Sequence, residues 1–392
     1  KFKKTPAGEI PVDWECASLS SIANIIMGQS PESSDCNDKA EGTPFYQGNA
    51  DFGRLYPVPS SWCTSPTKLA KEGDILISVR APVGEINIAS HDCCVGRGLS
   101  AIRPTEADCK YLYYALFSSS QAFDKLAQGS TFKAINGGDL ADLPIALPSS
   151  RHEQEKIGQI LWALDENIGK TIDEITKTKE LKDNLMRQLF TRGIGNKKFK
   201  KTPMGEIPIE WELGELGNEC AVTKLAGFEY TKYFKYKNDG EIIALRALNI
   251  KGEELDLSDV QTIDLAVSNG LLRSKLFEGD VVVTYIGAKI GDVLRIPESN
   301  KYHLAPNIAK ITPTAEFHSW FLLRVLQSNV AQRQIKSLTA TTAMPSLTMQ
   351  QIRKIVLPKP SPEEQDEITN IISVIVDEIK RKEEGLSKLL AL

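Results

Sequence analysis

KFKKTPAGEIPVDWE at residues 1–15 recurs as KFKKTPMGEIPIEWE at residues 198–212. The two stretches differ at only three of fifteen positions, an agreement that chance does not produce. A weaker similarity follows further along the chain. EGDILISVRAPVGE at residues 72–85 resembles EGDVVVTYIGAKIGD at residues 278–292. The sequence therefore predicts two copies of one module, placed end to end.

The repeat continues to the end of each copy. GLSAIRP (98–104) is answered by NIAKITP (307–313), and LADLPIALPSSRHEQEKI (140–157) by QIRKIVLPKPSPEEQDEI (351–368). The edges of the copies match closely, whereas the interiors match only in pattern. Drift after duplication should not spare both edges, so we expect the edges to serve one shared task and the interiors two different ones.

Each copy has the pattern of a mixed α/β globule followed by a long helix. Short apolar, β-branched runs predict buried strands at residues 74–79 and 281–285. Aromatic and aliphatic residues at helical spacing predict helices over 110–127 and 317–337. A strand that ends in Leu-Pro is expected to close each globule.

The two long helices are expected to start at Glu153 and Glu363. Their aliphatic residues recur three and four positions apart, in the narrow stripes typical of paired helices. Because short connections join each globule to its helix, the second helix must run antiparallel to the first if they pair. The second copy stops at Leu392 where the first continues, so we expect the second helix to be truncated.

The predicted fold class is α+β, with two α/β globules joined and separated by two long antiparallel helices that form a coiled coil with a pseudo-two-fold axis. The predicted domains are a first globule, a central spacer helix, a second globule and a C-terminal helix, at residues 1–150, 151–195, 196–361 and 362–392.

Composition excludes several classes of protein. Apolar content of 41% and charged content of 25% are ordinary for a globular chain, and no apolar run approaches the ~20 residues of a membrane span. The seven cysteines show no C-x-x-C spacing and there are only four histidines, so we expect free thiols and no metal site. These features favour a cytoplasmic protein with no membrane partner.

The net charge of −4 argues at first against a nucleic-acid partner. Basic residues nevertheless outnumber acidic ones over residues 198–360, while the reverse holds over residues 1–150. We therefore expect the isolated chain to bind DNA weakly and to need a partner for much of its phosphate contact.

Three motifs resemble those of specificity subunits of Type I restriction-modification systems. They are the IP-x-x-W start of each copy, the Leu-Pro-x(3–5)-EQ sequence that leads into each long helix, and LKDNLMRQLFTRG at the end of the first helix. The resemblance covers nearly the whole chain. It implies that each globule is a target recognition domain reading one half-site in double-stranded DNA. It also implies that the helices form a spacer that docks two modification subunits.

The resemblance places catalysis in partner subunits. Modification subunits would methylate adenine with S-adenosylmethionine, and restriction subunits would add ATP- and Mg-dependent translocation and cleavage. The chain itself has no G-x-x-x-x-G-K-[ST], no G-x-G-x-x-G and no Asn/Asp-Pro-Pro-aromatic motif, so we expect no catalytic residues and no bound cofactor. The residues alone leave two alternatives open: a coiled-coil assembly scaffold of two protein-binding domains, or an enzyme with a loose motif. A third alternative is a specificity subunit of a related methyltransferase or nuclease system.

Candidate DNA-contacting residues are polar or basic side chains expected on exposed loops. Those of the first copy are Gln29, Ser30, Tyr46, Gln47, Asn49, Arg54, Arg80, Arg97, Ser130, Thr131 and Lys133. Those of the second copy are Lys224, Tyr230, Lys232, Arg246, Asn249, Lys289, Thr339, Thr341 and Thr342.

Each candidate also has a structural alternative. A polar residue flanked by glycine is more often part of a turn than a base reader, and Tyr46 could belong to the core. Arg80 and Lys289 gain support from occupying matching turns in the two copies. Trp14 and Trp211 are expected to be packing residues, and Asp74 and Asp280 to form turns.

Overall fold

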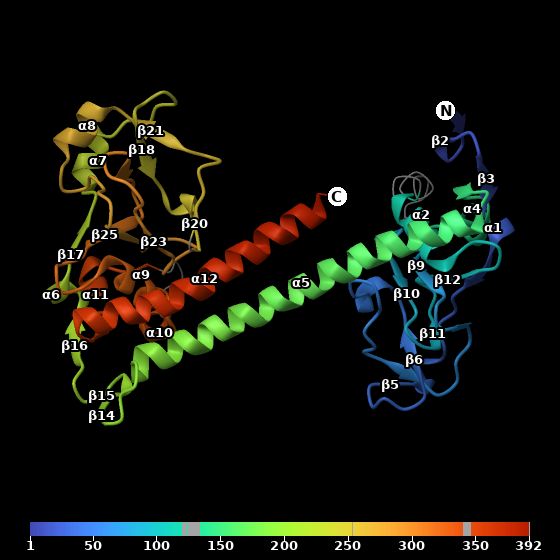
Figure 1. The fold of residues 1–392 in the computed structure, drawn as a ribbon, viewed down its shortest axis with the longest axis horizontal. Helices are drawn as coiled ribbons and strands as arrows, with labels where there is room; N and C mark the ends of the chain where they lie inside the picture. The colour runs from blue at the N-terminus through green and yellow to red at the C-terminus, as the bar shows by residue number, and fades with distance from the viewer. Residues whose placement is uncertain (120–122, 124–133, 253, 340–345, 392) are drawn as a thin grey trace. The chain divides into compact units, whose positions relative to one another are not determined.

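The chain forms two compact units, residues 1–172 with 389–392 (unit 1) and residues 173–388 (unit 2). The computed structural model describes all residues except 120–122, 124–133, 253, 340–345 and 392 (Figure 1). Helix α5 (Arg151–Arg192) is continuous over 42 residues and contributes to both units. Among the described residues, no helix combines the length and apolarity needed to cross a bilayer.

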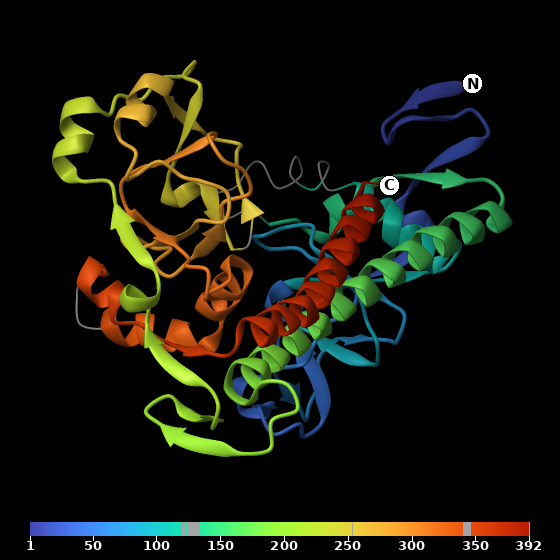
Figure 2. The same ribbon diagram turned by 60° about the vertical axis from the view of Figure 1, so that its left-hand side comes forward.

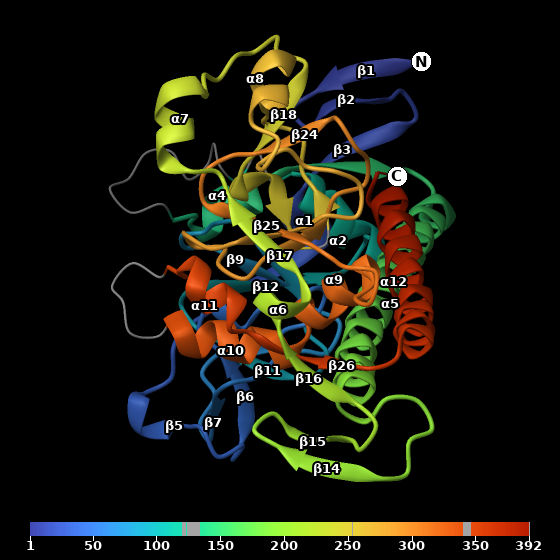
Figure 3. The ribbon, with the colours of Figure 1, turned by 90° about the vertical axis from the view of Figure 1, so that its left-hand side faces the viewer.

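The centre of each globule is a four-stranded antiparallel sheet. In unit 1 its order is β10 (Ile86–Ile88), β9 (Ile75–Ser78), β12 (Leu99–Pro104) and β4 (Ala23–Met27). In unit 2 the same order is built from β23 (Val293–Arg295), β22 (Val281–Thr284), β25 (Ile308–Thr312) and β17 (Ala221–Lys224). Strands β25 and β17 of this sheet lie side by side in Figure 3. The predicted strands at β9 and β22 are confirmed, and both are buried along their whole length.

A second sheet in each globule contains one parallel pair. In unit 1, β6 (Thr43–Tyr46) runs parallel to β11 (Cys93–Val95), with β5 (Cys36–Asn37), β7 (Trp62–Cys63) and β8 (Leu69–Ala70) completing five strands. In unit 2, β18 (Ile242–Leu245) runs parallel to β24 (Tyr302–Leu304), next to β21 (Gln261–Ile263). The hairpin of β19 (Ile250–Lys251) and β20 (Glu254–Leu255) has its own pairing.

The duplicated flanks fold alike in the two units. Strands β1 (Phe2–Thr5) and β2 (Gly8–Pro11) form a hairpin, as do β14 (Phe199–Thr202) and β15 (Gly205–Pro208). Gly8 and Gly205 hold φ of 102° and 107° in the turns, a region that side chains disfavour. The closing strands β13 (Pro144–Pro148) and β26 (Val356–Lys359) pair with β3 (Trp14–Ser18) and β16 (Glu212–Glu215), as the Leu-Pro pattern predicts.

Short helices accompany the sheets of both units. In unit 1 they are η1 (Ser33–Asp35), η2 (Asn49–Asp51), α1 (Leu19–Ile22), α2 (Cys109–Ser118) and α4 (Gly137–Ala141). In unit 2 they are η3 (Ala247–Asn249), α6 (Leu216–Glu219), α7 (Gly227–Tyr233), α8 (Leu265–Gly270), α9 (Ser319–Gln327), α10 (Asn329–Thr339) and α11 (Met349–Arg353).

The predicted single helix over 317–337 was wrong, because α9 and α10 are separated at Ser328. Ser328 has extended backbone angles, and its hydroxyl donates to the carbonyl of Val325 at 2.6 Å. That hydroxyl also accepts a hydrogen bond from the amide of Val330 at 3.3 Å. The serine thus ends one helix and caps the next, a use of Ser that helical periodicity does not reveal.

Within unit 2, the last turns of α5 lie beside α12 (Pro362–Leu390) and run in the opposite direction (Figures 1 and 2). Glu174 pairs with Lys382, and the ammonium of Lys179 lies 2.7 Å from the carboxylate of Glu383. At the other end of the overlap, the amide of Ile194 donates to the carboxylate of Glu364 at 3.0 Å.

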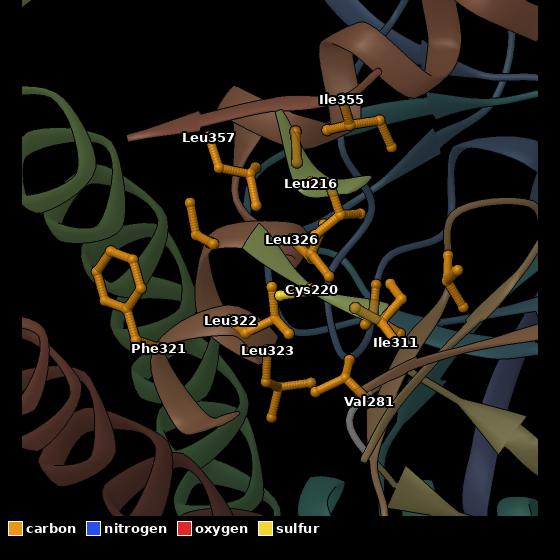
Figure 4. Close-up of a cluster of buried hydrophobic side chains, with 14 of the residues drawn as sticks. Leu216, Cys220, Val281, Ile311, Phe321, Leu322, Leu323, Leu326, Ile355 and Leu357 are labelled. Carbon is orange, nitrogen blue, oxygen red and sulfur yellow. The ribbon is translucent and has the colours of Figure 1, made fainter. Parts of the chain in front are cut away.

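The largest apolar core joins the second globule to both helices (Figure 4). Phe321 of α9 lies between the globule and α5, where its ring packs on Phe190 with centroids 5.5 Å apart. The buried face of α5 therefore differs from the aliphatic stripe expected from the sequence. Met186 and Phe190 are buried, while the aliphatic residue Leu181 is 57% exposed.

Candidate nucleic-acid interface

A buried glutamine fixes the start of each long helix to its globule. The side-chain carbonyl of Gln154 accepts from the amide of Asp108 at 2.9 Å, and its amide donates to the carbonyl of Pro148 at 2.9 Å. Gln365 accepts from the amide of His318 at 2.9 Å and donates to the carbonyls of Glu316 and Pro360. We call each arrangement the glutamine clamp.

The duplicated tryptophan supports the same joint. The indole of Trp14 donates to Glu153 at 3.3 Å, and that of Trp211 donates to Glu364 at 2.7 Å. Trp211 is buried, as predicted for a packing residue, whereas Trp14 is partly exposed. Sequence reasoning gave these glutamate and glutamine residues no role, although their repetition in both copies was a signal.

The repeated aspartates form turns, as predicted. Asp74 accepts from the amide of Lys71 at 2.7 Å, and Arg103 donates to both of its oxygens at 2.9 and 2.7 Å. Asp280 accepts from the amide of Phe277 at 2.8 Å and from the hydroxyl of Thr312 at 2.6 Å. These buried carboxylates hold the strands on which the candidate loops are mounted.

Four segments of the first globule meet at one surface, which we call the first loop cluster (residues 28–30, 47–49, 79–80 and 95–98). The hydroxyl of Ser30 donates to the side chain of Gln47 at 2.8 Å and accepts from the amide of Arg97 at 3.3 Å. The amide of Val79 donates to the carbonyl of Gly98 at 2.9 Å, which brings Arg80 to the same cluster.

Close backbone packing makes this cluster compact. A Cβ atom on Gly28 would lie 2.2 Å from the carbonyl oxygen of Gly96, so only glycine fits there. The exposed predicted residues in the cluster are Gln29, Gln47, Arg80 and Arg97, while Ser30 and Asn49 are partly exposed. Two arginines and several amide side chains on one tight surface suit contact with phosphates and base edges.

Two predicted residues of the first globule serve the structure instead. Tyr46 is fully buried, and its hydroxyl lies 3.1 Å from His91, so it has no surface to offer DNA. Burial also raises the pKa of Tyr46 far above its usual value. Arg54 is partly exposed but pairs with Asp165 of α5 at 3.0 Å. The predictions at Ser130, Thr131 and Lys133 lie outside the described residues.

In the second globule, Arg246 and Asn249 shape a loop. Asn249 is fully buried, accepts from the amide of Arg246 at 3.1 Å, and donates to the carbonyls of Asp256 and Asp259. The predicted base contact of Asn249 is therefore corrected to a structural role. The guanidinium of Arg246 bonds Asp259 through one terminal nitrogen at 3.0 Å, which leaves part of its surface accessible.

The predicted match between Arg80 and Lys289 needs correction. Arg80 forms a backbone bridge to Ala134, and the residue with the equivalent bridge in unit 2 is Ile286, which pairs with Ser346. Lys289 lies further along the same turn and is partly buried, with its ammonium donating to the carbonyl of Ile250 at 2.7 Å. The turns correspond, but the two basic side chains do not.

The remaining described candidates of the second globule contact aromatic rings or the backbone of their own helix. The ammonium of Lys224 sits 5.7 Å from the ring centre of Tyr285, and that of Lys232 sits 5.0 Å from the ring centre of Tyr233. Hydrogen bonding to Tyr233 raises the pKa of Lys232. The ring of Tyr230 packs against the rings of Phe234 and Tyr236. The hydroxyl of Thr339 donates to the carbonyl of Ile335 within α10. The predictions at Thr341 and Thr342 lie outside the described residues.

Comparison with known proteins gives this geometry its context. The family model described as "Type I restriction modification DNA specificity domain" matches residues 11–182 and 208–389, which are the two copies. The chain belongs to this specificity-domain family.

Curated relatives have the same description. The chain is 24% identical over 394 residues to the Type I restriction enzyme MjaVIII specificity subunit of Methanocaldococcus jannaschii, covering 97% of this chain and 91% of the relative. It is 42% identical over 197 residues to the putative MjaX specificity subunit of the same organism, covering 49% of this chain and 46%, under half, of that relative.

A solved structure agrees at the level of the fold. The Type I restriction-modification S subunit from M. genitalium superposes with a TM-score of 0.64 at 17% identity, covering 99% of this chain and 96% of that one. The two-copy architecture of this specificity-domain protein is thus one already seen in an S subunit.

The second specificity domain has buried histidine and lysine side chains, whereas no histidine or lysine is buried among the described residues of the first. His303 is fully buried between the hydroxyls of Ser268 and Ser274, at 2.9 and 3.0 Å. Burial lowers the pKa of His303 to about 4, with Lys310 and Lys275 adding to the effect. Burial also lowers the pKa of Lys310, whose ammonium donates to the carbonyl of Lys275 at 2.8 Å.

Proposed function

We propose that this chain is the DNA-recognition subunit of a Type I restriction-modification complex, in which each globule reads one half of a bipartite, asymmetric site in double-stranded DNA. One observation carries the proposal. The two globules share their central sheet order and glutamine clamp, while their candidate contact loops differ in chemistry and length. A constant frame with two different reading surfaces suits a target of two unlike halves.

The long helices would set the distance between the half-sites and dock two modification subunits. Support comes from the unbroken course of α5, from its antiparallel overlap with α12 in unit 2, and from the family of the chain. On this proposal the two helices form one coiled coil with a pseudo-two-fold axis between the copies. The base-pair spacing recognised then follows the length of the helices.

Catalysis would reside in the partners. We propose that modification subunits methylate adenine with S-adenosylmethionine, that restriction subunits use ATP and Mg, and that this chain binds no cofactor itself. The sequence supports this division because it has none of the nucleotide-binding or methyltransferase motifs named above.

Exchange of one reading surface tests the proposal directly. Residues 16–150 are replaced by the corresponding segment of a relative, and the assembled complex is assayed for the DNA sequence that it methylates. We expect one half-site to change and the other to stay. An assembly scaffold would leave both half-sites unchanged, and methylation or cleavage by the purified chain alone would reveal an enzyme.

The spacer proposal has a separate test. Seven residues are inserted into α5 after Ile175 and seven into α12 after Ile379, which keeps the heptad register of both helices. Seven helical residues add about 10 Å, close to the rise of three base pairs. The preferred spacer should lengthen by about three base pairs, and an unaltered spacer in an active complex would rule out the ruler.

A further inference from the structure

Hydrogen bonds within the first loop cluster distinguish the two ends of the Gln47 side chain. The hydroxyl of Ser30 accepts from the amide of Arg97 at 3.3 Å, so its own proton is available to donate to the side-chain oxygen of Gln47 at 2.8 Å. If the amide of Gln47 were turned round, its nitrogen would face Ser30 and the serine proton would lose this acceptor. The chain of bonds from Arg97 through Ser30 therefore directs the side-chain oxygen of Gln47 toward the serine.

Close packing on glycine holds the same oxygen against the protein. A Cβ atom on Gly96 would lie 2.7 Å from the side-chain oxygen of Gln47 and 2.9 Å from its Cα atom, so the side chain lies directly on this buried glycine. A Cβ atom on Gly98 would lie 2.6 Å from the backbone oxygen of Gln47. Since Gln47 is exposed, the amide nitrogen with its two N–H donors is the polar atom left to face solvent.

The place of Gln47 in the fold recurs in the second globule. Gln47 directly follows β6, which runs parallel to β11, and it precedes η2. In unit 2 the residue between the equivalent strand β18 and η3 is Arg246. Arg246 offers only N–H donors, and part of its surface stays accessible beside its bond to Asp259. Both copies thus present donors at the same point of the shared frame.

A side chain that offers only donors selects among the bases. In the major groove guanine presents two adjacent acceptors, N7 and O6, whereas adenine presents an acceptor beside a donor and cytosine presents a donor. The common pairing of glutamine with adenine uses the amide oxygen to accept from the N6 amino group. Because the oxygen of Gln47 is turned toward Ser30 and Gly96, that pairing is not open to it. The two N–H donors of Gln47 match the guanine edge instead.

We infer that Gln47 is a specificity-determining residue of the first globule and that its amide nitrogen donates to a guanine in the major groove of one half-site. Ser30 is its positioning residue. The inference rests on the proposed function, because it assigns one base to one contact of the first reading surface. A bond from the same nitrogen to a phosphate is the competing interpretation, and it would carry no base preference.

The test compares variants of the chain in complex with the modification subunits. The half-site of the first globule is the one that changes when residues 16–150 are exchanged. Fluorescence anisotropy then gives the affinity for duplexes that carry each of the four base pairs at each position of that half-site. We expect the wild type to prefer guanine to adenine at one position on the order of tenfold. In Gln47→Glu only acceptors face the groove, so the preference at that position should move to a base with an amino donor, cytosine or adenine.

Variants of Ser30 test the positioning. Ser30→Ala lets the amide of Gln47 turn round and accept from adenine, so the preference for guanine at the same position should fall to about twofold. Ser30→Thr keeps the hydroxyl and should keep the preference of the wild type. The matched control, Asn24→Asp, also exchanges an exposed amide for a carboxylate, at the end of β4 away from the first loop cluster, and should leave every base preference unchanged.

The outcomes separate the inference from the proposed function. A wild-type complex without sequence preference would defeat the proposed function itself. A wild-type complex that discriminates, together with unchanged base preferences in Gln47→Glu, would overturn the inference alone. An equal loss of affinity for every duplex would assign Gln47 to a phosphate and overturn it as well. Gln47→Ala adds no charge and should lose the guanine preference without reversing it, so it decides the question if Gln47→Glu binds no duplex.

Discussion

The two globules have the same strand order in the central sheet, yet they differ in the second sheet and in the helices beside it. The second sheet has five strands in unit 1 and three in unit 2, which has the β19–β20 hairpin and the helices α7 and α8 in addition. The glutamine clamp, the Trp–Glu contact and the buried aspartate recur in both. The residues that recur in both units therefore belong to the shared frame, whereas the residues that differ can serve a separate task in each unit.

The largest difference is expected between the repeated tryptophans. Trp211 is buried in the main core of unit 2, so Trp211→Ala should destabilise that unit by about 3–5 kcal/mol. Trp14 is partly exposed and makes a longer hydrogen bond, so Trp14→Ala should cost only about 1 kcal/mol. Urea unfolding followed by hydrogen exchange of each unit would measure both. Equal losses would show that the two joints are packed alike.

Acid should destabilise unit 2 through His303. Its pKa is about 4 when folded and about 6.5 when unfolded, so below pH 6.5 the unfolded state binds the extra proton. The contribution of neutral His303 is complete above pH 6.5 and is lost as pH falls toward 4, by roughly 3 kcal/mol in all.

The His303→Gln variant isolates this effect. Between pH 7 and 4.5 the wild type should lose about 2 kcal/mol more stability in unit 2 than the variant, measured by hydrogen exchange of residues 221–312. Parallel losses in the two proteins would mean that another group dominates the acid response.

Arginines of the first loop cluster should matter for DNA more than for stability. Arg97→Ala or Arg80→Ala in the assembled complex should weaken binding by about 1–3 kcal/mol if the side chain reads a base, with relaxed specificity in one half-site only. A phosphate contact would instead weaken all duplexes alike. Unchanged binding by both variants would remove the first loop cluster from the interface, while Gln47→Ala serves as the uncharged comparison.

The smallest effect is expected at the contact between Arg54 and helix α5 in unit 1. Arg54 and Asp165 are partly exposed, so Arg54→Ala should lower stability by less than about 1 kcal/mol. It should leave the salt dependence of DNA binding unaltered, because the arginine is occupied by the helix. A reduced salt slope would show that Arg54 contacts phosphate after all, as its exposure alone first indicated.

The sequence predicted the architecture better than the surface. The strands β9 and β22, the closing strands and the two long helices carry strong periodicity, and the structure contains all of them. The break at Ser328 was missed because it depends on one hydroxyl. Among candidate contacts, Asn249 and Tyr46 failed because polarity beside a turn does not distinguish a side chain that caps its own loop from one that faces solvent.

Glu364 connects three segments of unit 2. One carboxylate accepts from the indole of Trp211, from the amide of Ile194 and from the side chain of Asn196, at 2.7, 3.0 and 3.0 Å. The segment after α5, the residue before β16 and the start of α12 therefore share one carboxylate. Because Glu364 bonds all three, a displacement of the start of α12 would also displace Trp211 and the chain at Ile194 and Asn196.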